Sequence, residues 1–253
     1  MEPLKSIIIT GASSGIGKAL AIKYASTNVK LFLCSRNFEK LMIVHDLCQN
    51  LGAIVESISL DLTDTDKTSK WVNNCFAKNN IDLIIANAGI SLNTSKIKEF
   101  ETSTRKLFDV NVNGTLNTIL PAISHFIKQK NGQIAIMSSL AGYRGMPSCP
   151  AYSASKGAMK LFAEGLRGEL ATYNIRVSTI CPGFVKTPLT DQNNFKMPFI
   201  MEAEKAAEII AYGLSKNKSR ISFPTPLVFV TWLLSCIPPV ISDKIYAYMP
   251  KKS

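Results

Sequence analysis

Tyr152 and Lys156 form the residue pair in this sequence that is best suited to proton transfer. They are four positions apart, and on a helix this spacing brings both side chains to one face, one turn from each other. A tyrosine with an ordinary pKa of about 10 is poorly tuned for reversible proton transfer, but a neighbouring ammonium stabilises the phenolate and lowers that pKa. The pair therefore predicts an acid–base centre.

Ser139 lies 13 residues before Tyr152 (152 − 139 = 13), close behind the apolar run 133–137. A short apolar run of this kind predicts a buried strand. At the carboxyl end of a strand, a serine hydroxyl can donate a hydrogen bond to a substrate oxygen and orient it. Ser139 is therefore a candidate partner of Tyr152 and Lys156.

A glycine-rich turn follows the apolar run 6–10 and precedes a helical pattern at 17–26. It reads Thr10-Gly11-Ala12-Ser13-Ser14-Gly15-Ile16-Gly17. Glycines allow a tight turn and a close backbone approach to a diphosphate, and the helix N-terminus presents free N–H groups to the anion. The turn predicts a dinucleotide-binding site, although its spacing, Gly-x-x-x-Gly-x-Gly, differs from the common Gly-x-Gly-x-x-Gly.

This spacing resembles the cofactor motif of the short-chain dehydrogenase/reductase family, and the likeness runs over residues 5–223. Asp61-Leu62 resembles the family's adenine contact. Asn87-Ala88-Gly89 resembles its Asn-Asn-Ala-Gly motif, with Ala86 in place of the first Asn. Pro182-Gly183, with Val185 and Thr187, resembles the segment that closes over the nicotinamide.

The resemblance also implies a catalytic tetrad of Asn111, Ser139, Tyr152 and Lys156, with Tyr152 as general acid/base. Asn111 is assigned by the family's Asn-x-x-Gly pattern, which ends here at Gly114, and would hold a water that relays protons to Lys156. Asn113 is the alternative. The family's tyrosine and lysine also contact the cofactor.

The end of the second predicted strand bears on which nicotinamide cofactor binds. Enzymes that use NAD typically have an acid there, which accepts from the ribose 2′-hydroxyl and would repel a 2′-phosphate. Here Ser35 takes that position, and Arg36 follows with a guanidinium suited to phosphate. NADP(H) is therefore favoured over NAD(H), although Ser14 stands where many NADP enzymes of the family have a basic residue. The expected cofactor-binding residues are Gly11, Ser13, Ser14, Gly15, Ile16, Gly17, Ser35, Arg36, Asp61, Leu62, Asn87, Ala88, Gly89, Tyr152, Lys156, Pro182, Gly183, Val185 and Thr187.

Short apolar runs alternate with longer amphipathic stretches, which predicts a doubly wound α/β sheet with ligands at the carboxyl ends of its strands. We expect a single Rossmann-type domain with a seven-stranded parallel sheet over residues 1–223, followed by an apolar extension over 224–253. The predicted strands are 6–10, 30–34, 54–60, 83–86, 133–137, 176–180 and 220–223. The predicted helices are 17–26, 38–50, 66–78, 104–129, 151–172 and 203–216.

The 253-residue chain has a formal charge of +11, from 29 Lys+Arg against 18 Asp+Glu. These charges are dispersed, so nucleic acid is not an expected partner. The six cysteines are scattered and the two histidines lie far apart, which favours reduced thiols and no metal site. With no signal peptide at the N-terminus, we expect a cytoplasmic protein. The long helices predict a homodimer or homotetramer by analogy with the family.

The substrate region and the tail are the least constrained parts of the sequence. The loops expected over the active site carry Tyr143, Met146, Phe195, Met197 and Phe199, which indicate either a hydrophobic or acyl-like ketone or, equally, residues that only pack the lid. Arg144 and Lys196 could meet an anionic carrier such as coenzyme A or acyl carrier protein, or could equally be solvated surface cations. The apolar run 227–237 is too short to cross a bilayer. We expect it to pack on the domain or to lie peripherally at a membrane.

The leading hypothesis is an NADP(H)-dependent oxidoreductase that reduces a lipid-like or acyl ketone to an alcohol. An NAD-linked alcohol dehydrogenase is the alternative within the enzymes. A non-catalytic nucleotide-binding sensor is the alternative outside them, and the complete tetrad argues against it.

Overall fold

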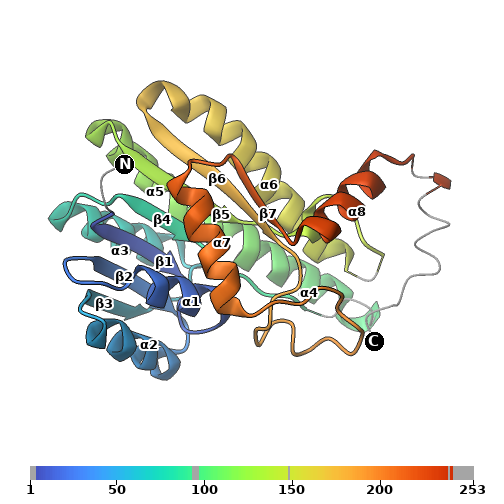
Figure 1. The fold of residues 1–253 in the computed structure, drawn as a ribbon, viewed down its shortest axis with the longest axis horizontal. Helices are drawn as coiled ribbons and strands as arrows, with labels where there is room; N and C mark the ends of the chain where they lie inside the picture. Colours follow the sequence, from blue (N-terminus) through green and yellow to red (C-terminus); the bar gives the residue numbers. More distant parts are fainter. Residues whose placement is uncertain (1–3, 93–96, 148, 239, 242–253) are drawn as a thin grey trace.

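The computed structural model describes residues 4–92, 97–147, 149–238, 240 and 241. It contains a seven-stranded parallel sheet with the strand order β3-β2-β1-β4-β5-β6-β7 (Figure 1). This arrangement confirms the doubly wound α/β fold expected from the sequence. The strands are β1 (Ser6–Thr10), β2 (Lys30–Ser35), β3 (Ile54–Ser59), β4 (Leu83–Ala86), β5 (Gly132–Met137), β6 (Ile175–Pro182) and β7 (Arg220–Phe223).

The central strands are apolar at almost every position because helices cover both faces of the sheet. Ile8 of β1 pairs in register with Phe32 of β2 and with Ile84 of β4, and all three side chains are buried. Side chains that alternate along these strands feed two separate cores, one on each face. The strands are therefore recognisable from the sequence as continuous apolar runs.

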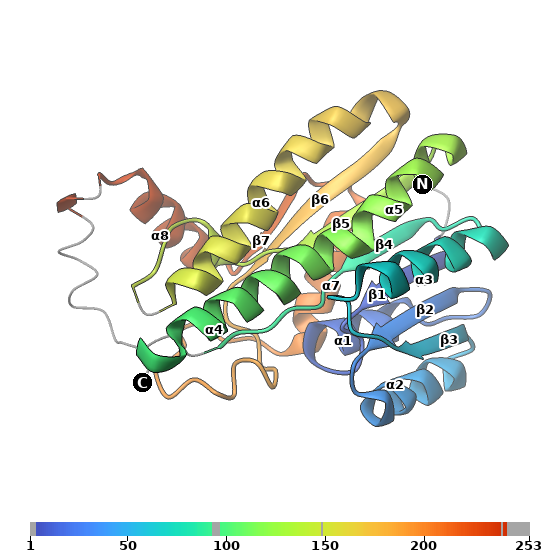
Figure 2. The same ribbon diagram turned by 180° about the vertical axis from the view of Figure 1, so that it is seen from behind.

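The helices divide into two layers. One layer holds α1 (Gly15–Tyr24), α2 (Phe38–Asn50) and α7 (Ala203–Ser215), which lie over the face seen in Figure 1. The opposite layer holds α3 (Thr65–Lys78), α4 (Ile97–Phe108), α5 (Gly114–Gln129) and α6 (Pro150–Leu170), seen from behind in Figure 2. β1 and β4 are neighbours in the sheet, but the helix that follows β1 covers one face of the sheet and the helices that follow β4 cover the other. The chain therefore reverses its direction of winding between these two strands.

The predicted helix at 104–129 is correct in type but wrong in its start and in its regularity. The helix begins earlier, at Ile97, as α4. Its first turns were missed because the residues before 104 are mostly polar and show no clear apolar period. Between α4 and α5 lies a π-helical turn, η1 (Asp109–Asn113). One extra residue in a turn of helix changes which side chains face the sheet, and such turns are frequent at functional sites.

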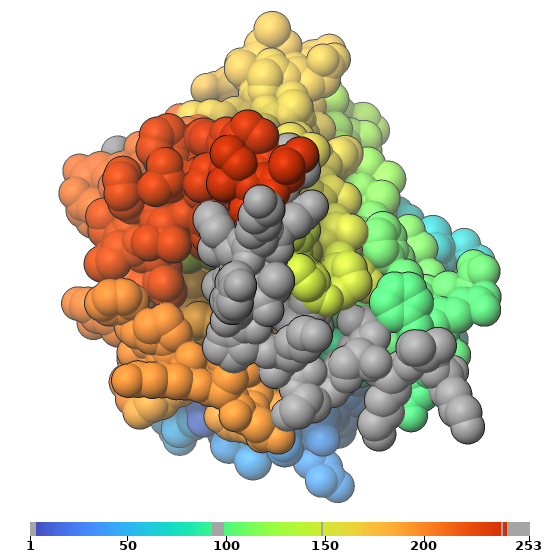
Figure 3. Space-filling view, turned by 90° about the vertical axis from the view of Figure 1, so that its right-hand side faces the viewer, coloured from blue at the N-terminus to red at the C-terminus, as the bar shows by residue number. Residues whose placement is uncertain are grey.

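Helix α8 (Thr225–Cys236) follows β7 and stands at one end of the molecule, coloured red in Figures 1 and 3. It contacts β7 and the short 3-10 helix η2 (Leu140–Gly142). Within the described residues, no helix is both long and apolar enough to cross a membrane.

Candidate active site

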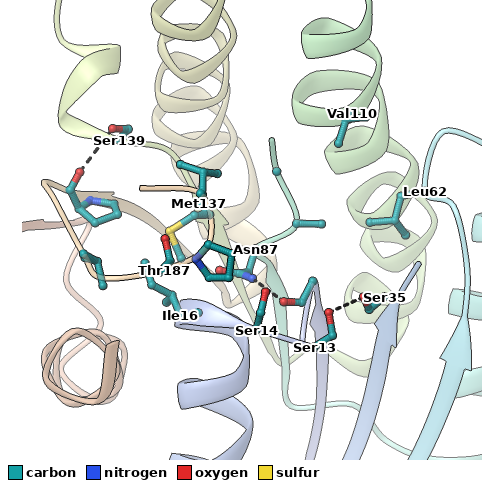
Figure 4. A pocket seen from close by; sticks show the side chains of 18 of the residues that line it. Ser13, Ser14, Ile16, Ser35, Leu62, Asn87, Val110, Met137, Ser139 and Thr187 are labelled. Atoms are coloured by element: carbon teal, nitrogen blue, oxygen red, sulfur yellow. Dashed lines mark hydrogen bonds between the residues drawn. The ribbon is translucent and has the colours of Figure 1, made fainter. Parts of the chain in front are cut away.

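A cavity lies at the carboxyl ends of the strands, where the winding reverses between β1 and β4 (Figure 4). It is lined by the glycine-rich turn, by the ends of β2, β4 and β5, and by the segment after β6. All the candidate catalytic and cofactor-binding residues line this cavity except Gly17 and Asn111, whereas none of the substrate-loop residues named above does. The fold therefore gathers residues that are up to 176 positions apart (187 − 11) around one space.

The glycine-rich turn needs glycine for two different reasons. Gly11 has a φ of +65°, and a Cβ there would lie 2.8 Å from the Ala88 Cα. Gly17 lies behind the cavity, where a Cβ would come within 2.2 Å of the Gly11 carbonyl oxygen. Gly11 thus permits the turn itself, whereas Gly17 lets α1 pack closely against the turn.

Thr10 and Asn87 lock the ends of β1 and β4 together. The Thr10 hydroxyl accepts hydrogen bonds from the main-chain N–H groups of Asn87 and Ala88, each at 3.1 Å. The Asn87 amide in turn donates to the carbonyl oxygens of Thr10, at 3.0 Å, and Gly11, at 3.3 Å. This reciprocal set holds the glycine-rich turn in one position, which an apolar pair could not do.

The N-terminus of α1 faces the cavity with its donors available. Ser14 is the N-cap residue, but its side chain makes no capping hydrogen bond to the first turn. The orphan N–H groups of that turn and the positive end of the helix dipole can therefore interact with an anion. A Cβ on Gly15 would lie 2.8 Å from the Thr187 Cγ2, so the segment after β6 closes tightly over this helix end.

The end of β2 presents Ser35 and Arg36. The Ser35 hydroxyl is hydrogen-bonded to the Ser13 hydroxyl at 2.7 Å, which ties the strand to the glycine-rich turn (Figure 4). The Arg36 side chain is exposed and makes no hydrogen bond or ion pair with any residue that the structure describes. Asp61 lies nearby, and the Thr63 main-chain N–H, its hydroxyl and the charge of Arg36 together lower the pKa of the Asp61 carboxyl.

Tyr152 lies near the start of α6, hydrogen-bonded to Ser139. Burial raises the pKa of Tyr152 to about 12, and the hydrogen bond with Ser139 lowers it only in part. The sequence suggested instead that Lys156 would lower this pKa. The lowering expected from Lys156 together with the positive charge of an oxidised nicotinamide stays a prediction for the cofactor complex; in the protein alone the Lys156 Nζ lies 5.9 Å from the centre of the Tyr152 ring, and desolvation raises the pKa.

Lys156 is buried, and its Nζ donates a hydrogen bond to the Met137 carbonyl oxygen at 3.1 Å. Burial lowers the pKa of Lys156 from 10.5 to about 8. The main chain of the same residue is also held, because the Ser138 hydroxyl donates to the Lys156 carbonyl oxygen at 2.7 Å. Lys156 is therefore fixed against the end of β5 at both its backbone and its side chain.

Asn111 lies in the π-helical turn and is completely buried. Its side-chain oxygen accepts from the Ile90 N–H at 2.8 Å, and its Nδ2 donates to the Ile90 carbonyl oxygen at 3.0 Å and to the Ser155 hydroxyl at 3.1 Å. The alternative, Asn113, is exposed and donates to Asp109 instead. Of the two asparagines, only Asn111 faces Lys156: a Cβ on Gly89 would contact the Lys156 Nζ and the Asn111 Oδ1 together.

Sequence reasoning missed several residues of the site. Ser155 bridges Asn111 to the helix of Tyr152, since its hydroxyl also donates to the Tyr152 carbonyl oxygen at 2.8 Å. Other lining residues lie within three positions of the predicted ones in the sequence, and that adjacency was the available signal. They are Cys34, Leu60, Val110, Met137, Ser138, Pro188, Leu189 and Thr190.

The connection between Ser139 and Tyr152 is anchored at two consecutive residues. The Tyr143 hydroxyl is hydrogen-bonded to the Ser222 hydroxyl of β7 at 2.9 Å. The Arg144 guanidinium donates to the carbonyl oxygens of Leu234, at 3.1 Å, and Ile237, at 2.8 Å, at the end of α8. The suggestion that Arg144 meets an anionic carrier is therefore not supported, because its guanidinium caps a helix C-terminus.

Comparison with known proteins places these observations in context. A family model described as short chain dehydrogenase matches residues 5–197. A protein named as an uncharacterized oxidoreductase from Myxococcus xanthus is 36% identical over 240 residues, which cover 94% of this chain and 95% of the relative.

Solved structures share the fold. A short-chain dehydrogenase from Sphingobium yanoikuyae in complex with NADPH superposes with a TM-score of 0.82 at 21% identity, over 99% of this chain and 98% of that one. A short chain dehydrogenase from Mycobacterium paratuberculosis bound to NAD gives a TM-score of 0.77 at 24% identity, over 86% of this chain and 94% of that one. The two neighbours thus hold different nicotinamide cofactors.

Proposed function

Because this chain belongs to the short-chain dehydrogenase/reductase family and is an oxidoreductase, we propose that it reduces a carbonyl to an alcohol with NADPH. One observation carries the proposal: Ser139, Tyr152 and Lys156 line one end of the same cavity whose other end is the glycine-rich turn. A dinucleotide that spans this cavity would bring its reactive ring beside the one acid–base pair in it.

The residues of the cavity fit a nicotinamide dinucleotide. Gly11 brings the backbone close to the space, and the free first-turn donors of α1 suit a diphosphate. Asp61 and Leu62 line the cavity where the adenine would lie, and Pro182, Gly183, Val185 and Thr187 line it where the nicotinamide would lie. Two of the related structures are bound to NAD and to NADPH, respectively.

Two features support NADP(H) over NAD(H). Position 35 is a serine that is already hydrogen-bonded to Ser13, so no carboxylate stands there to repel a 2′-phosphate. The exposed Arg36 guanidinium lines the cavity and is attracted to Asp61, whose charge a phosphate would outweigh. The guanidinium fork matches phosphate oxygens in pairs.

The chemistry assigned to this chain is proton transfer and orientation, while the bound nicotinamide supplies or accepts the hydride. Tyr152 donates its hydroxyl proton to the substrate oxygen as the carbon is reduced. Ser139 donates a hydrogen bond to the same oxygen and so fixes the carbonyl. The raised pKa of Tyr152 keeps its hydroxyl neutral in the protein alone, and the positive charges of Lys156 and of an oxidised nicotinamide would lower that pKa when the cofactor is bound.

Lys156 and Asn111 stand behind Tyr152 in this scheme. The Lys156 ammonium stabilises the phenolate that is left once the proton has gone, and its pKa of about 8 allows it to pass a proton on near neutral pH. Both Nδ2 protons of Asn111 are already donated. A relay water could therefore bind Asn111 only by donating to one of its oxygens.

We further propose a hydrophobic, lipid-like or acyl ketone as the substrate. Tyr143, Met146, Phe195 and Met197 are half-buried in the loops that would flank it. Phe184 and Phe195 stack edge to face, with their ring centres 5.9 Å apart, which gives those loops an apolar lining.

The test is a turnover assay with the purified protein, NADPH or NADH, and a panel of ketones of increasing chain length. The proposal predicts oxidation of NADPH that is faster for longer, apolar ketones. Turnover only with NAD and alcohols would favour the oxidative alternative. Cofactor binding without turnover of any ketone or alcohol would favour a nucleotide sensor.

A further inference from the structure

The C-terminal end of α8 is held by a cation from a distant part of the chain. The last carbonyl groups of an α-helix lack partners within the helix and form the negative end of its dipole. The sequence of α8 contains no charged residue to meet them. Instead the half-buried Arg144, 90 positions before Leu234, donates from Nη1 to the carbonyl oxygens of Leu234 and Ile237. The end of α8 is thus fixed to the connection between Ser139 and Tyr152.

The preceding residue, Tyr143, fixes the same connection to the sheet and to α6. Its hydroxyl is hydrogen-bonded to the Ser222 hydroxyl of β7 at 2.9 Å. The Lys160 Nζ and the Arg220 guanidinium lie 5.7 Å and 5.5 Å from the centre of its ring, where the aromatic face attracts a cation. Glu164 pairs with both of these cations. Two consecutive side chains therefore tie the connection to three elements, β7, α6 and α8.

The short helix η2, at the start of this connection, lies directly against the main chain of the catalytic lysine. A Cβ on Gly142 would lie 2.8 Å from the Lys156 carbonyl carbon and 2.9 Å from the Gly157 nitrogen. Ser139 caps η2, because its Oγ accepts from the Ala141 N–H at 3.1 Å. A displacement of η2 would therefore be felt at Ser139 and at the main chain of Lys156.

The other end of α8 contacts the segment that follows β6. The Gly183 N–H donates to the Phe223 carbonyl oxygen at 2.7 Å. A Cβ on Gly183 would lie 3.0 Å from the Pro224 Cδ and 3.1 Å from the Leu227 Cδ1. One helix thus contacts, at its start, the segment proposed to cover the nicotinamide and, at its end, the connection that carries Arg144.

We propose that α8 positions the connection between Ser139 and Tyr152 relative to the nicotinamide end of the cavity, and that Arg144 is the positioning residue through which it does so. Arg144 does not line the cavity, so it acts by holding the connection and not by touching the substrate. The effect on the ketone, which this connection would flank, rests on the proposed function. The holding of the connection by α8 does not.

Hydrogen exchange of the full chain tests the contact without any substrate. Within η2 and just after it, the Gly142 N–H donates to the Ser139 carbonyl oxygen and the Tyr143 N–H to that of Leu140. Arg144→Met removes the donors, and exchange at Gly142 and Tyr143 should rise about tenfold or more. Arg144→Lys should exchange like the wild type. Both printed bonds come from one nitrogen, and an ammonium has three protons to donate.

The matched control is Arg167→Met. The Arg167 guanidinium also donates to main-chain carbonyl oxygens, those of Val177 and Asn217, but it lies outside the active-site cavity. The control should leave exchange at Gly142 and Tyr143 unchanged. Unchanged exchange in Arg144→Met, or an equal rise in Arg167→Met, would overturn the proposal.

Steady-state kinetics test whether the contact positions the substrate. In Arg144→Met, kcat/KM for the ketone should fall by roughly 10- to 100-fold, as expected when a group near the reacting atoms is misplaced. The dissociation constant of NADPH should change little, because the glycine-rich turn lies at the other end of the cavity. Arg144→Lys should restore kcat/KM, and Arg167→Met should keep it. Faster exchange in Arg144→Met with kcat/KM unchanged would show that the connection is held but does not position the substrate.

A double variant shows whether Arg144 acts through α8. Leu233 is exposed, and Leu233→Pro breaks the last turns of α8 that carry the acceptor carbonyls. Leu233→Ala keeps the helix and is the control. If Arg144 acts through α8, Leu233→Pro alone should lower kcat/KM as Arg144→Met does, and the double variant should be no worse than either. Effects that multiply would overturn the proposal, because Arg144 would then act on the substrate directly.

The two proposals can fail separately. If the wild type turns over no ketone, the proposed function fails, while exchange at Gly142 and Tyr143 still decides whether α8 holds the connection. If the wild type turns over ketones and Arg144→Met changes neither exchange nor kcat/KM, the proposed function stands and the positioning role of α8 is wrong.

Discussion

The Asn111 side chain pairs with both main-chain groups of Ile90, accepting from its N–H at 2.8 Å and donating to its carbonyl oxygen at 3.0 Å. This pairing joins the π-helical turn to the segment after β4. It also sets the position of Ser155, which receives the second amide proton of Asn111. The conformation of the π-helical turn therefore affects, through Asn111 and Ser155, where α6 places Tyr152 and Lys156.

Asn111→Ala should lower both stability and turnover. The variant leaves the buried N–H and carbonyl of Ile90 without partners, which should lower the free energy of unfolding by about 2 kcal/mol or more. Urea unfolding and steady-state kinetics measure the two effects. The control is Asn113→Ala, an exposed position two residues away, which should stay within about 0.5 kcal/mol of the wild type. Equal behaviour of the two variants would remove the special role of Asn111.

Tyr152→Phe should lower turnover by roughly 10²–10⁴-fold, because it removes the proposed proton donor. Cofactor affinity, measured by quenching of protein fluorescence, should change little, because the ring remains. Tyr173→Phe, at an exposed tyrosine outside the cavity, serves as the control and should be as active as the wild type. If Tyr152→Phe keeps activity within a few-fold of the wild type, another group supplies the proton.

Lys156→Met should make the protein more stable at neutral pH while abolishing its activity. The pKa of Lys156 is about 8 in the folded protein against an ordinary value of 10.5. Since the unfolded chain holds this proton more tightly, the charged lysine opposes folding fully below about pH 8. This cost disappears progressively as pH rises from 8 to 10.5. The gain at pH 7 is up to about 3 kcal/mol.

Urea unfolding at pH 7 and pH 10 without added cofactor tests the direction of this pH dependence of stability. The stability advantage of Lys156→Met should shrink at the higher pH. Lys40→Met, at an exposed position on α2, should show no such trend. A variant that is less stable than the wild type at pH 7 would show that the hydrogen bond to Met137 outweighs desolvation.

Arg36→Ala should weaken NADPH binding by roughly 10- to 150-fold, because a charged hydrogen bond to phosphate contributes about 1.5–3 kcal/mol. Binding of NADH should be little affected. Ser35→Asp combined with Arg36→Ala should reverse the preference between the two cofactors. Isothermal titration with each cofactor measures this, with Lys40→Ala as the control for loss of a nearby surface cation. A wild type that already prefers NADH would contradict the proposed preference.

We expect the protein to form a dimer or a tetramer through α5 and α6. Leu120 and Leu161 on these helices are 51% and 65% exposed, respectively, which leaves apolar surface for a second copy. Light scattering at micromolar concentration should give a multiple of the 27.7 kDa chain mass. Leu161→Glu should shift the population toward the monomer. A monomeric wild type would count against this assembly.

Local patterns in the sequence were sufficient for the architecture. The apolar runs around Ile8 and Ile84 indicated buried strands, because a parallel sheet excludes water from both faces. The glycine-rich turn was recognisable because only glycine meets its backbone requirements, as at Gly11. Tyr152 and Lys156 could be paired because helical spacing alone places them on one face.

Features that depend on distant segments could not be read in this way. The position of the Asn111 side chain depends on hydrogen bonds to Ile90, which lies 21 residues earlier in the sequence. The directions of the pKa shifts at Tyr152 and Lys156 come from burial, which no spacing reveals. Arg144 looked like a surface cation until α8 was placed against it.

The sequence by itself determined the fold, the glycine-rich turn and the acid–base pair, since each is set by side-chain period or backbone conformation within a few residues. Only the tertiary structure decided how Asn111 is held, how far Lys156 is desolvated, and that α8 leaves Phe229 and Trp232 exposed. The physical reason is that desolvation and hydrogen-bond pairing depend on what the rest of the chain packs around a residue. An apolar run such as that of α8 signals only that some partner is needed, and the packed fold shows whether that partner lies within the chain.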